Sequence, residues 1–152
     1  HDRLASLGPQ AVIEAITGLA DGTLKGEVQD DSLATYAHKL NKDEALLDWS
    51  RPAVELERLI RAFNPWPICH SSLNGAPLKV LAAQLVTEQG EGRGAPGEIL
   101  AASKDGLTVA CADGALRLTR LQLPGGKALN FADLFNSRRE QFAVGSLLGA
   151  SA

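Results

Sequence analysis

The stretch ICHSSLNGAPLKVLAAQLV, residues 68–86, decides the fold class of this chain. Two runs typical of β-strands, residues 68–73 and 77–86, flank the dipeptide Asn74-Gly75. Both residues of this dipeptide readily adopt a positive φ, which favours a tight turn between antiparallel strands. The stretch therefore predicts a β-hairpin.

Three further strands are predicted towards the C-terminus. Runs 107–112 and 115–123 flank Asp113-Gly114, which predicts a second hairpin, and a short strand at 98–102 precedes them. In the last run the alternation of leucines skips a position near Thr119, which indicates a β-bulge of the kind that bends small barrels. Five to six short, strongly coiled strands predict a mainly β fold with flanking helices, in the form of a small OB-like Greek-key barrel.

Helices are predicted on both sides of these strands. Ser50 and Pro52 mark the start of a helix that ends at the segment Asn64-Pro65-Trp66-Pro67. Trp66, held between two prolines, is predicted to pack against the protein rather than to stack on a ligand. A last helix begins near Asn130, whose side chain is expected to cap it.

The first 50 residues differ in charge from the rest. They contain 4 Lys or Arg against 9 Asp or Glu, whereas residues 51–152 contain 11 against 9. Pro9 predicts the start of an amphipathic helix that ends at Asp21-Gly22, and the weak polar pattern after it predicts a linker. The apolar face of this helix has no partner within the first 50 residues, and the chain opens at His1. We therefore expect residues 1–24 to be the last helix of a preceding domain, residues 25–50 to be a linker and residues 51–152 to form the barrel domain.

The composition is that of an ordinary globular protein, with 45% hydrophobic and 22% charged residues. No apolar run approaches the roughly 20 residues needed to cross a bilayer, so we expect a soluble, cytoplasmic protein without membrane contact. Cys69 and Cys111 are far apart in the sequence and are predicted to be reduced, buried thiols.

Catalytic motifs find little support in this sequence. Cys69 and His70 are neighbours on a predicted strand, so their side chains point to opposite faces. The glycine-rich residues 90–97 lack the lysine of a phosphate-binding loop, and no metal-ligand spacing is present. We expect no catalytic residue and no metal site, which leaves binding as the function. Barrels of this type commonly bind oligonucleotides through lysine and arginine, although the basic residues are equally consistent with scattered solubilising charge.

Five motifs resemble the bacterial methionyl-tRNA formyltransferases, and together they extend the resemblance over practically the whole chain. They are AHKLNKDEALLDWS at 37–50, IRAFNPWP at 60–67, PGEIL at 96–100, DGAL at 113–116 and NSRRE at 136–140. The combination of the first two is specific. The second alone is shared with formyltransferases that act on folate or on a nucleotide sugar, and the last favours the tRNA enzymes.

The resemblance implies a two-domain enzyme that transfers a formyl group from 10-formyltetrahydrofolate to the α-amine of methionine on initiator tRNA. An N-terminal Rossmann-like domain holds the folate and the catalytic residues in this family, and an OB-like C-terminal domain helps to bind tRNA. By this resemblance, residues 1–24 are the end of the first domain. The chain alone would be inactive and would bind no cofactor, and the intact enzyme would be a monomer.

The resemblance also implies a surface that contacts methionyl initiator tRNA. The linker lysines lie near the acceptor arm in the family, and basic residues of the barrel follow the inner side of the tRNA, where contacts to phosphates fix position rather than read sequence. The predicted contact residues are Lys39, Lys42, Arg61, Lys79, Lys127, Arg138 and Arg139. Arg61 alternatively anchors the segment around Trp66. Two other functions remain open: a module of a formyltransferase that acts on a small molecule, and a noncatalytic scaffold.

Overall fold

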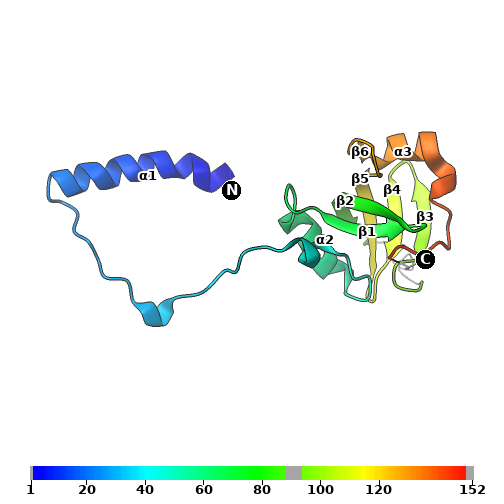
Figure 1. Cartoon of the computed structure of the whole chain (residues 1–152), viewed down its shortest axis with the longest axis horizontal. Helices are drawn as coiled ribbons and strands as arrows, with labels where there is room; N and C mark the ends of the chain where they lie inside the picture. Colours follow the sequence, from blue (N-terminus) through cyan, green and yellow to red (C-terminus); the bar gives the residue numbers. More distant parts are fainter. Residues whose placement is uncertain (1, 88–93, 150–152) are drawn as a thin grey trace. The chain divides into compact units, whose positions relative to one another are not determined.

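The computed structural model describes residues 2–87 and 94–149. The chain divides into two compact units, residues 1–38 and residues 39–152, which are the blue and the cyan-to-red parts of Figure 1. Much of the predicted glycine-rich loop lies outside the described residues.

The first unit is a helix followed by a short turn. The helix α1 (Asp2–Ala20) begins earlier than predicted, and Pro9 lies inside it rather than at its start. The helix ends as expected before Asp21-Gly22, where Gly22 has a φ of 76° and the Thr23 amide donates to the Asp21 carboxylate at 2.9 Å. The apolar face of α1 is exposed: Ile13, for example, is 61% accessible. A short 3₁₀ turn, η1 (Asp31–Leu33), follows.

The second unit is built around a six-stranded antiparallel sheet, and the predicted fold class is confirmed. The strands are β1 (Cys69–Leu73), β2 (Ala76–Leu85), β3 (Ile99–Ser103), β4 (Gly106–Ala110), β5 (Ala115–Gln122) and β6 (Leu129–Asn130). Their order is β1-β2-β5-β4-β3, and the short β6 pairs with β5. Because β3, β4 and β5 are joined consecutively and β2 lies beside β5, the order is that of a Greek key.

The turn and the bulge that the sequence indicated are both present. Asn74 and Gly75 adopt φ values of 51° and 76° in the turn between β1 and β2. Ala82 pairs with Arg120 and the next residue of β2 pairs with Leu118, so Thr119 is the extra residue of β5. A second irregularity leaves Leu81 as the extra residue of β2. These two bulges bend the long β2–β5 ladder, as a small barrel requires.

The C-terminal segment connects the two edges of the sheet, which the sequence did not predict. Leu147 bridges to Glu98, just before β3, and Leu148 bridges to Leu73 at the end of β1. The Leu148 amide donates to the Gly97 carbonyl at 2.8 Å, and the next amide donates to Ser72 at 2.9 Å. The segment thereby satisfies backbone groups on both edge strands and closes the sheet towards a barrel.

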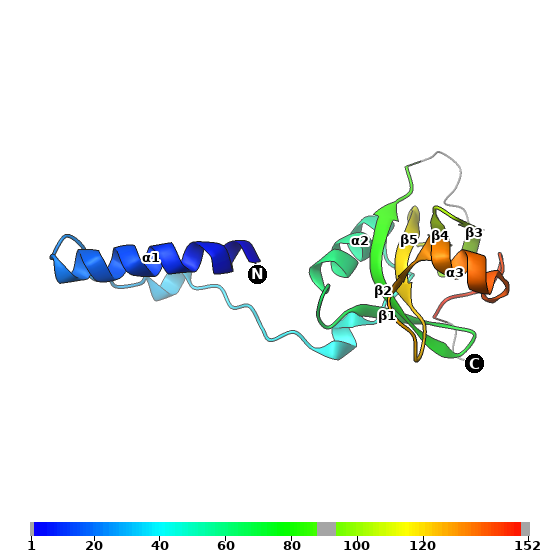
Figure 2. The same cartoon turned by 90° about the horizontal axis from the view of Figure 1, so that it is seen from above.

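Helices cover two sides of the strands. The helix α2 (Ala53–Ala62) packs on β2 and β5, whereas α3 (Phe131–Arg138) and the short η3 (Arg139–Gln141) pack at the end of the sheet that includes β6. The two helices lie on different sides of the barrel in Figures 1 and 2. The predicted side-chain cap at Asn130 is wrong, because its side chain forms no cap hydrogen bond and its backbone is extended as the last residue of β6.

The core of the barrel includes residues that precede α2. Ala45, Leu47 and Trp49 are buried, and the Leu47 amide donates to the His70 carbonyl of β1 at 2.8 Å. The indole N–H of Trp49 donates to the Ser71 hydroxyl at 3.0 Å inside the core. Residues 45–49, which the sequence placed in a linker that ends at residue 50, are therefore part of the compact unit.

Trp66 does not pack as predicted. Its side chain is 51% exposed. Asn64, two residues earlier, is anchored to the sheet, because its carboxamide donates to the Leu81 carbonyl at 2.8 Å. Residues 63–67 form a turn in which the Asn64-Pro65 and Trp66-Pro67 peptide bonds are cis, and the indole lies at the surface.

Candidate functional site

The two lysines predicted to contact tRNA from the linker lie at the start of the second unit. Lys42 begins the short helix η2 (Lys42–Ala45), in which Asn41 and Glu44 form a capping box. Ala45 at the end of this helix is buried, so η2 is anchored to the barrel. Lys39 lies three residues before Lys42 in a segment without regular secondary structure, and both lysines are exposed. The structure thus places Lys42 on an anchored turn rather than on a free linker.

Lys79 and Lys127 share one side of the barrel. Lys79 is an exposed residue of β2, and its cross-strand neighbours are His70 on β1 and Gln122 on β5. The Gln122 carboxamide donates to the Gly126 carbonyl at 2.8 Å, which fixes the loop that carries Lys127. These contacts bring Lys79 and Lys127, which are far apart in the sequence, to the same end of the β2–β5 ladder.

Arg138 and Arg139 lie at the end of α3 and have different environments. The guanidinium of Arg139 lies 5.1 Å from the centre of the Phe135 ring, a cation–π contact that holds it against the helix. Arg138 instead lines a cavity with Pro77 and Pro124. Pro77 shares the outer face of β2 with Lys79, and Pro124 begins the loop that carries Lys127, so Arg138 belongs to the same end of the barrel as these lysines.

Arg61 lies apart from this group. It sits on α2 and donates to Glu57 at 3.2 Å, in an exposed ion pair between residues four apart. Arg61 pairs with Glu57 of the same helix rather than with the segment around Trp66, so its predicted alternative role as an anchor of that segment finds no support. A neighbouring exposed pair, Arg51 with Glu55 at 2.8 Å, neutralises a second arginine of the same region.

Polar side chains that the sequence did not single out complete the cavity beside Arg138. They are Asn74, in the hairpin turn, and Gln141, at the end of η3. The hairpin pattern in the sequence predicts that Asn74 lies in a turn. It does not predict that Asn74 lies near the end of α3, because that proximity arises only when the barrel folds.

The two cysteines are free and buried, as predicted. Burial raises the pKa of Cys69 and that of Cys111 to about 11, so both remain protonated thiols near neutral pH. Within residues 2–87 and 94–149 there is no cluster of three or more metal-ligating side chains. In the same ranges, every buried side-chain nitrogen or oxygen has a hydrogen-bond partner.

Among residues 2–87 and 94–149, none of the helices is both long enough and apolar enough to cross a bilayer.

The second unit is thus a small barrel with exposed cations at the end that carries the β1–β2 hairpin, and comparison with known families places it. The chain belongs to the family described as "Formyl transferase, C-terminal domain", which matches residues 39–139. The matched range coincides closely with the second unit, including the segment before α2.

Relatives of high sequence identity include methionyl-tRNA formyltransferases of Pseudomonas. The chain is 78% identical over 152 residues to the enzymes of two Pseudomonas fluorescens strains, of which it covers 46% and 47%. It is 76% identical over 149 residues to the enzyme of a Pseudomonas putida strain. The chain therefore spans about half the length of the curated relatives it matches, and the resemblance seen in the motifs is confirmed.

Solved structures confirm the fold. HypX from Aquifex aeolicus matches with a TM-score of 0.67 at 20% identity, covering 89% of this chain and 24% of that one. HypX in complex with tetrahydrofolic acid matches with a TM-score of 0.64 at 21% identity, covering 84% and 22%. At this level of identity the likeness concerns the fold.

Proposed function

We propose that this chain is the C-terminal part of a methionyl-tRNA formyltransferase, and that its second unit helps to hold methionyl initiator tRNA while the α-amine of the methionine is formylated. The observation that carries the proposal is the 78% identity to such enzymes over all 152 residues. The exposed cations supply the physical means, because contacts to phosphates dominate the affinity of proteins for nucleic acids.

The placement of these cations supports positioning of tRNA rather than reading of its sequence. Lys39, Lys42, Lys79, Lys127 and Arg138 are exposed, and none of them takes part in an ion pair within the described residues. Arg139 is held by an aromatic ring and Arg61 by a carboxylate. Contacts from such side chains to the backbone of tRNA fix its orientation and register.

The folate donor does not fit this chain. A tetrahydrofolate has a polar pterin ring and a carboxylate tail, which need several convergent hydrogen-bonding groups. The largest of the four cavities described has a volume of about 470 Å³ and is lined mainly by apolar residues such as Leu46 and Leu148. Two polar side chains also line it, and the Ser50 hydroxyl donates to the Asp48 carboxylate at 2.6 Å. The Trp49 N–H already donates to Ser71, and no buried side-chain polar atom among the described residues lacks a partner.

We therefore assign 10-formyltetrahydrofolate and the catalytic residues to the part of the intact enzyme outside this chain. The chain alone is inactive in this proposal. Residues 1–24 are the last helix of the Rossmann-like domain, and the intact enzyme is a cytoplasmic monomer.

Binding of initiator tRNA to the 152-residue chain over a salt series tests this function. The double variant Lys39→Ala/Lys42→Ala is expected to bind more weakly. It should also lower the slope of log K against log salt concentration by about 2, because each lost phosphate contact lowers it by about 1. The matched control, Lys25→Ala/Lys104→Ala, removes the same charge from exposed positions outside the proposed surface. Its slope should fall less than that of the Lys39→Ala/Lys42→Ala variant.

Equal loss in both double variants would mean that only net charge matters. Absence of binding even at low salt would show that the unit is a scaffold for the rest of the enzyme, and the proposed contact residues would then be rejected.

A further inference from the structure

A small cavity lies between the β1–β2 hairpin, the end of β5 and the end of α3. Its volume is about 250 Å³, and its walls are mainly apolar. The lining residues are Leu73, Asn74, Ala76, Pro77, Leu78, Leu123, Pro124, Arg138 and Gln141. Leu73 and Leu78 belong to the packed core of the barrel, so they form a rigid apolar wall of the cavity.

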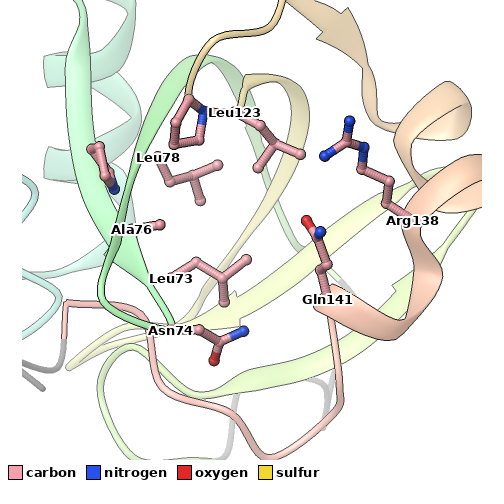
Figure 3. A pocket seen from close by; sticks show the side chains of 9 residues that line it. Leu73, Asn74, Ala76, Leu78, Leu123, Arg138 and Gln141 are labelled. Atoms are coloured by element: carbon pink, nitrogen blue, oxygen red, sulfur yellow. The ribbon is translucent and has the colours of Figure 1, made fainter.

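Three polar groups face that apolar wall. Figure 3 shows the guanidinium of Arg138 and the carboxamide of Gln141 on one side of the cavity and the carboxamide of Asn74 below Leu73, with Leu73 and Leu78 between these groups and the strands. None of the three end groups has a hydrogen-bond or ion-pair partner among the described residues. The cavity therefore offers unused donors and acceptors beside an apolar surface.

The size and the chemistry of the cavity restrict its ligand. Sites for drug-sized molecules measure about 300–1,000 Å³, so this one suits a smaller group. A carboxamide has a donor and an acceptor side by side and can pair with the edge of a nucleobase. The plane of an arginine guanidinium can stack on a base or bind a phosphate.

We propose that this cavity binds the base of one unpaired nucleotide of the tRNA. The inference rests on the proposed function, since it takes tRNA as the partner. The base lies against Leu73 and Leu78, the carboxamides of Asn74 and Gln141 bond to its edge, and Arg138 binds the adjoining phosphate or stacks on the base. Lys127 follows Pro124 in the loop at the rim and is placed to hold the backbone of the same strand.

Filling the cavity tests the proposal most directly. Ala76 lies at the exposed start of β2 and lines the cavity, so Ala76→Phe occupies the space at a strand position where an aromatic side chain is well tolerated. Ala101→Phe is the matched control, because Ala101 is an exposed strand residue outside the cavity. Gln141→Leu is a second variant that removes one carboxamide with little change of shape.

The first readout is a titration of the ¹⁵N-labelled 152-residue chain with the four nucleoside 5′-monophosphates. We expect amide shifts confined to residues 73–76, 78, 123 and 138–141, since Pro77 and Pro124 have no amide proton. We expect Ala76→Phe to abolish these shifts while Ala101→Phe retains them. Shifts of the same size in the Ala76→Phe variant, or no shifts in the unsubstituted chain, would overturn the inference.

The second readout is affinity for initiator tRNA. Loss of a bound base should weaken binding by about 5- to 100-fold in Ala76→Phe and in Gln141→Leu. The salt slope should not change, because neither variant removes a phosphate contact. If tRNA binds all variants equally well, the cavity inference is wrong and the proposed function stands. If tRNA does not bind the unsubstituted chain at any salt concentration, both the proposed function and this inference are wrong.

Discussion

Ser71→Ala is predicted to destabilise the barrel by leaving Trp49 without a partner. The indole N–H of Trp49 donates to the Ser71 hydroxyl at 3.0 Å, and the two residues are only 4% and 3% exposed. Water therefore does not reach the donor once the hydroxyl is removed. A buried donor without a partner costs about 1–3 kcal/mol. At roughly 4 °C per kcal/mol for a unit of this size, Tm should fall by about 4–12 °C.

A double-mutant cycle separates this effect from a general loss of packing. Trp49→Phe removes the donor, so Ser71→Ala in that background should cost only about 0.5 kcal/mol or less. Urea denaturation followed by far-UV circular dichroism gives the free energy of unfolding for all four proteins. Ser137→Ala, an exposed control, should change it by less than about 0.5 kcal/mol.

An equal cost of Ser71→Ala in both backgrounds would refute the reasoning. It would show that the hydrogen bond between the indole and the hydroxyl does not hold residues 45–49 to the barrel.

Three other predictions concern the same unit. Gly97→Ala should destabilise it more than Gly125→Ala in urea denaturation, although both residues have a positive φ. A Cβ at Gly97 would lie 2.5 Å from the Leu148 carbonyl oxygen, whereas a Cβ at Gly125 would have no heavy atom of another residue within 4 Å. A chain that begins at Arg51 should lose cooperative unfolding, whereas one that begins at Lys39 should unfold at the same urea midpoint as the longer chain; equal midpoints for both would contradict the burial of Trp49. The two buried thiols should react with iodoacetamide at pH 8 only after unfolding, since burial raises their pKa to about 11. The unfolded chain ionises them near their ordinary pKa of 9.0, so stability is retained below pH 9 and falls as the pH rises from 9 to 11; replacing both by alanine should flatten that fall.

The strands could be predicted from sequence because their signals are local. Asn74-Gly75 needs only its own backbone preferences to form a turn, and the skipped leucine position near Thr119 marks a bulge within one strand. The closing segment that contains Leu147 and Leu148 could not be predicted in this way. It is held by isolated bridges to two different strands, and such bridges impose no periodicity on the sequence.

The segment before α2 carries a weak strand pattern. Ala45, Leu47 and Trp49 alternate with exposed residues, which is the period of a strand with one buried face. The polar and charged residues 41–44 just before them favour the interpretation as a linker. Three alternating residues are a weak pattern until a neighbouring strand is known, and here that neighbour is β1.

The candidate site depends on charge placement rather than on net charge. Residues 39–152 contain 13 Lys or Arg against 12 Asp or Glu, so the unit as a whole attracts a polyanion little. The range of electrostatic attraction in physiological salt is about 8 Å, and local groups of unpaired cations therefore matter most. On α2, Glu57 neutralises Arg61, whereas Lys79, Lys127 and Arg138 gather at the hairpin end without ion pairs among the described residues. In the proposed function, the backbone of tRNA is thus drawn to the hairpin end, and Arg61 is the weakest of the seven predicted contacts.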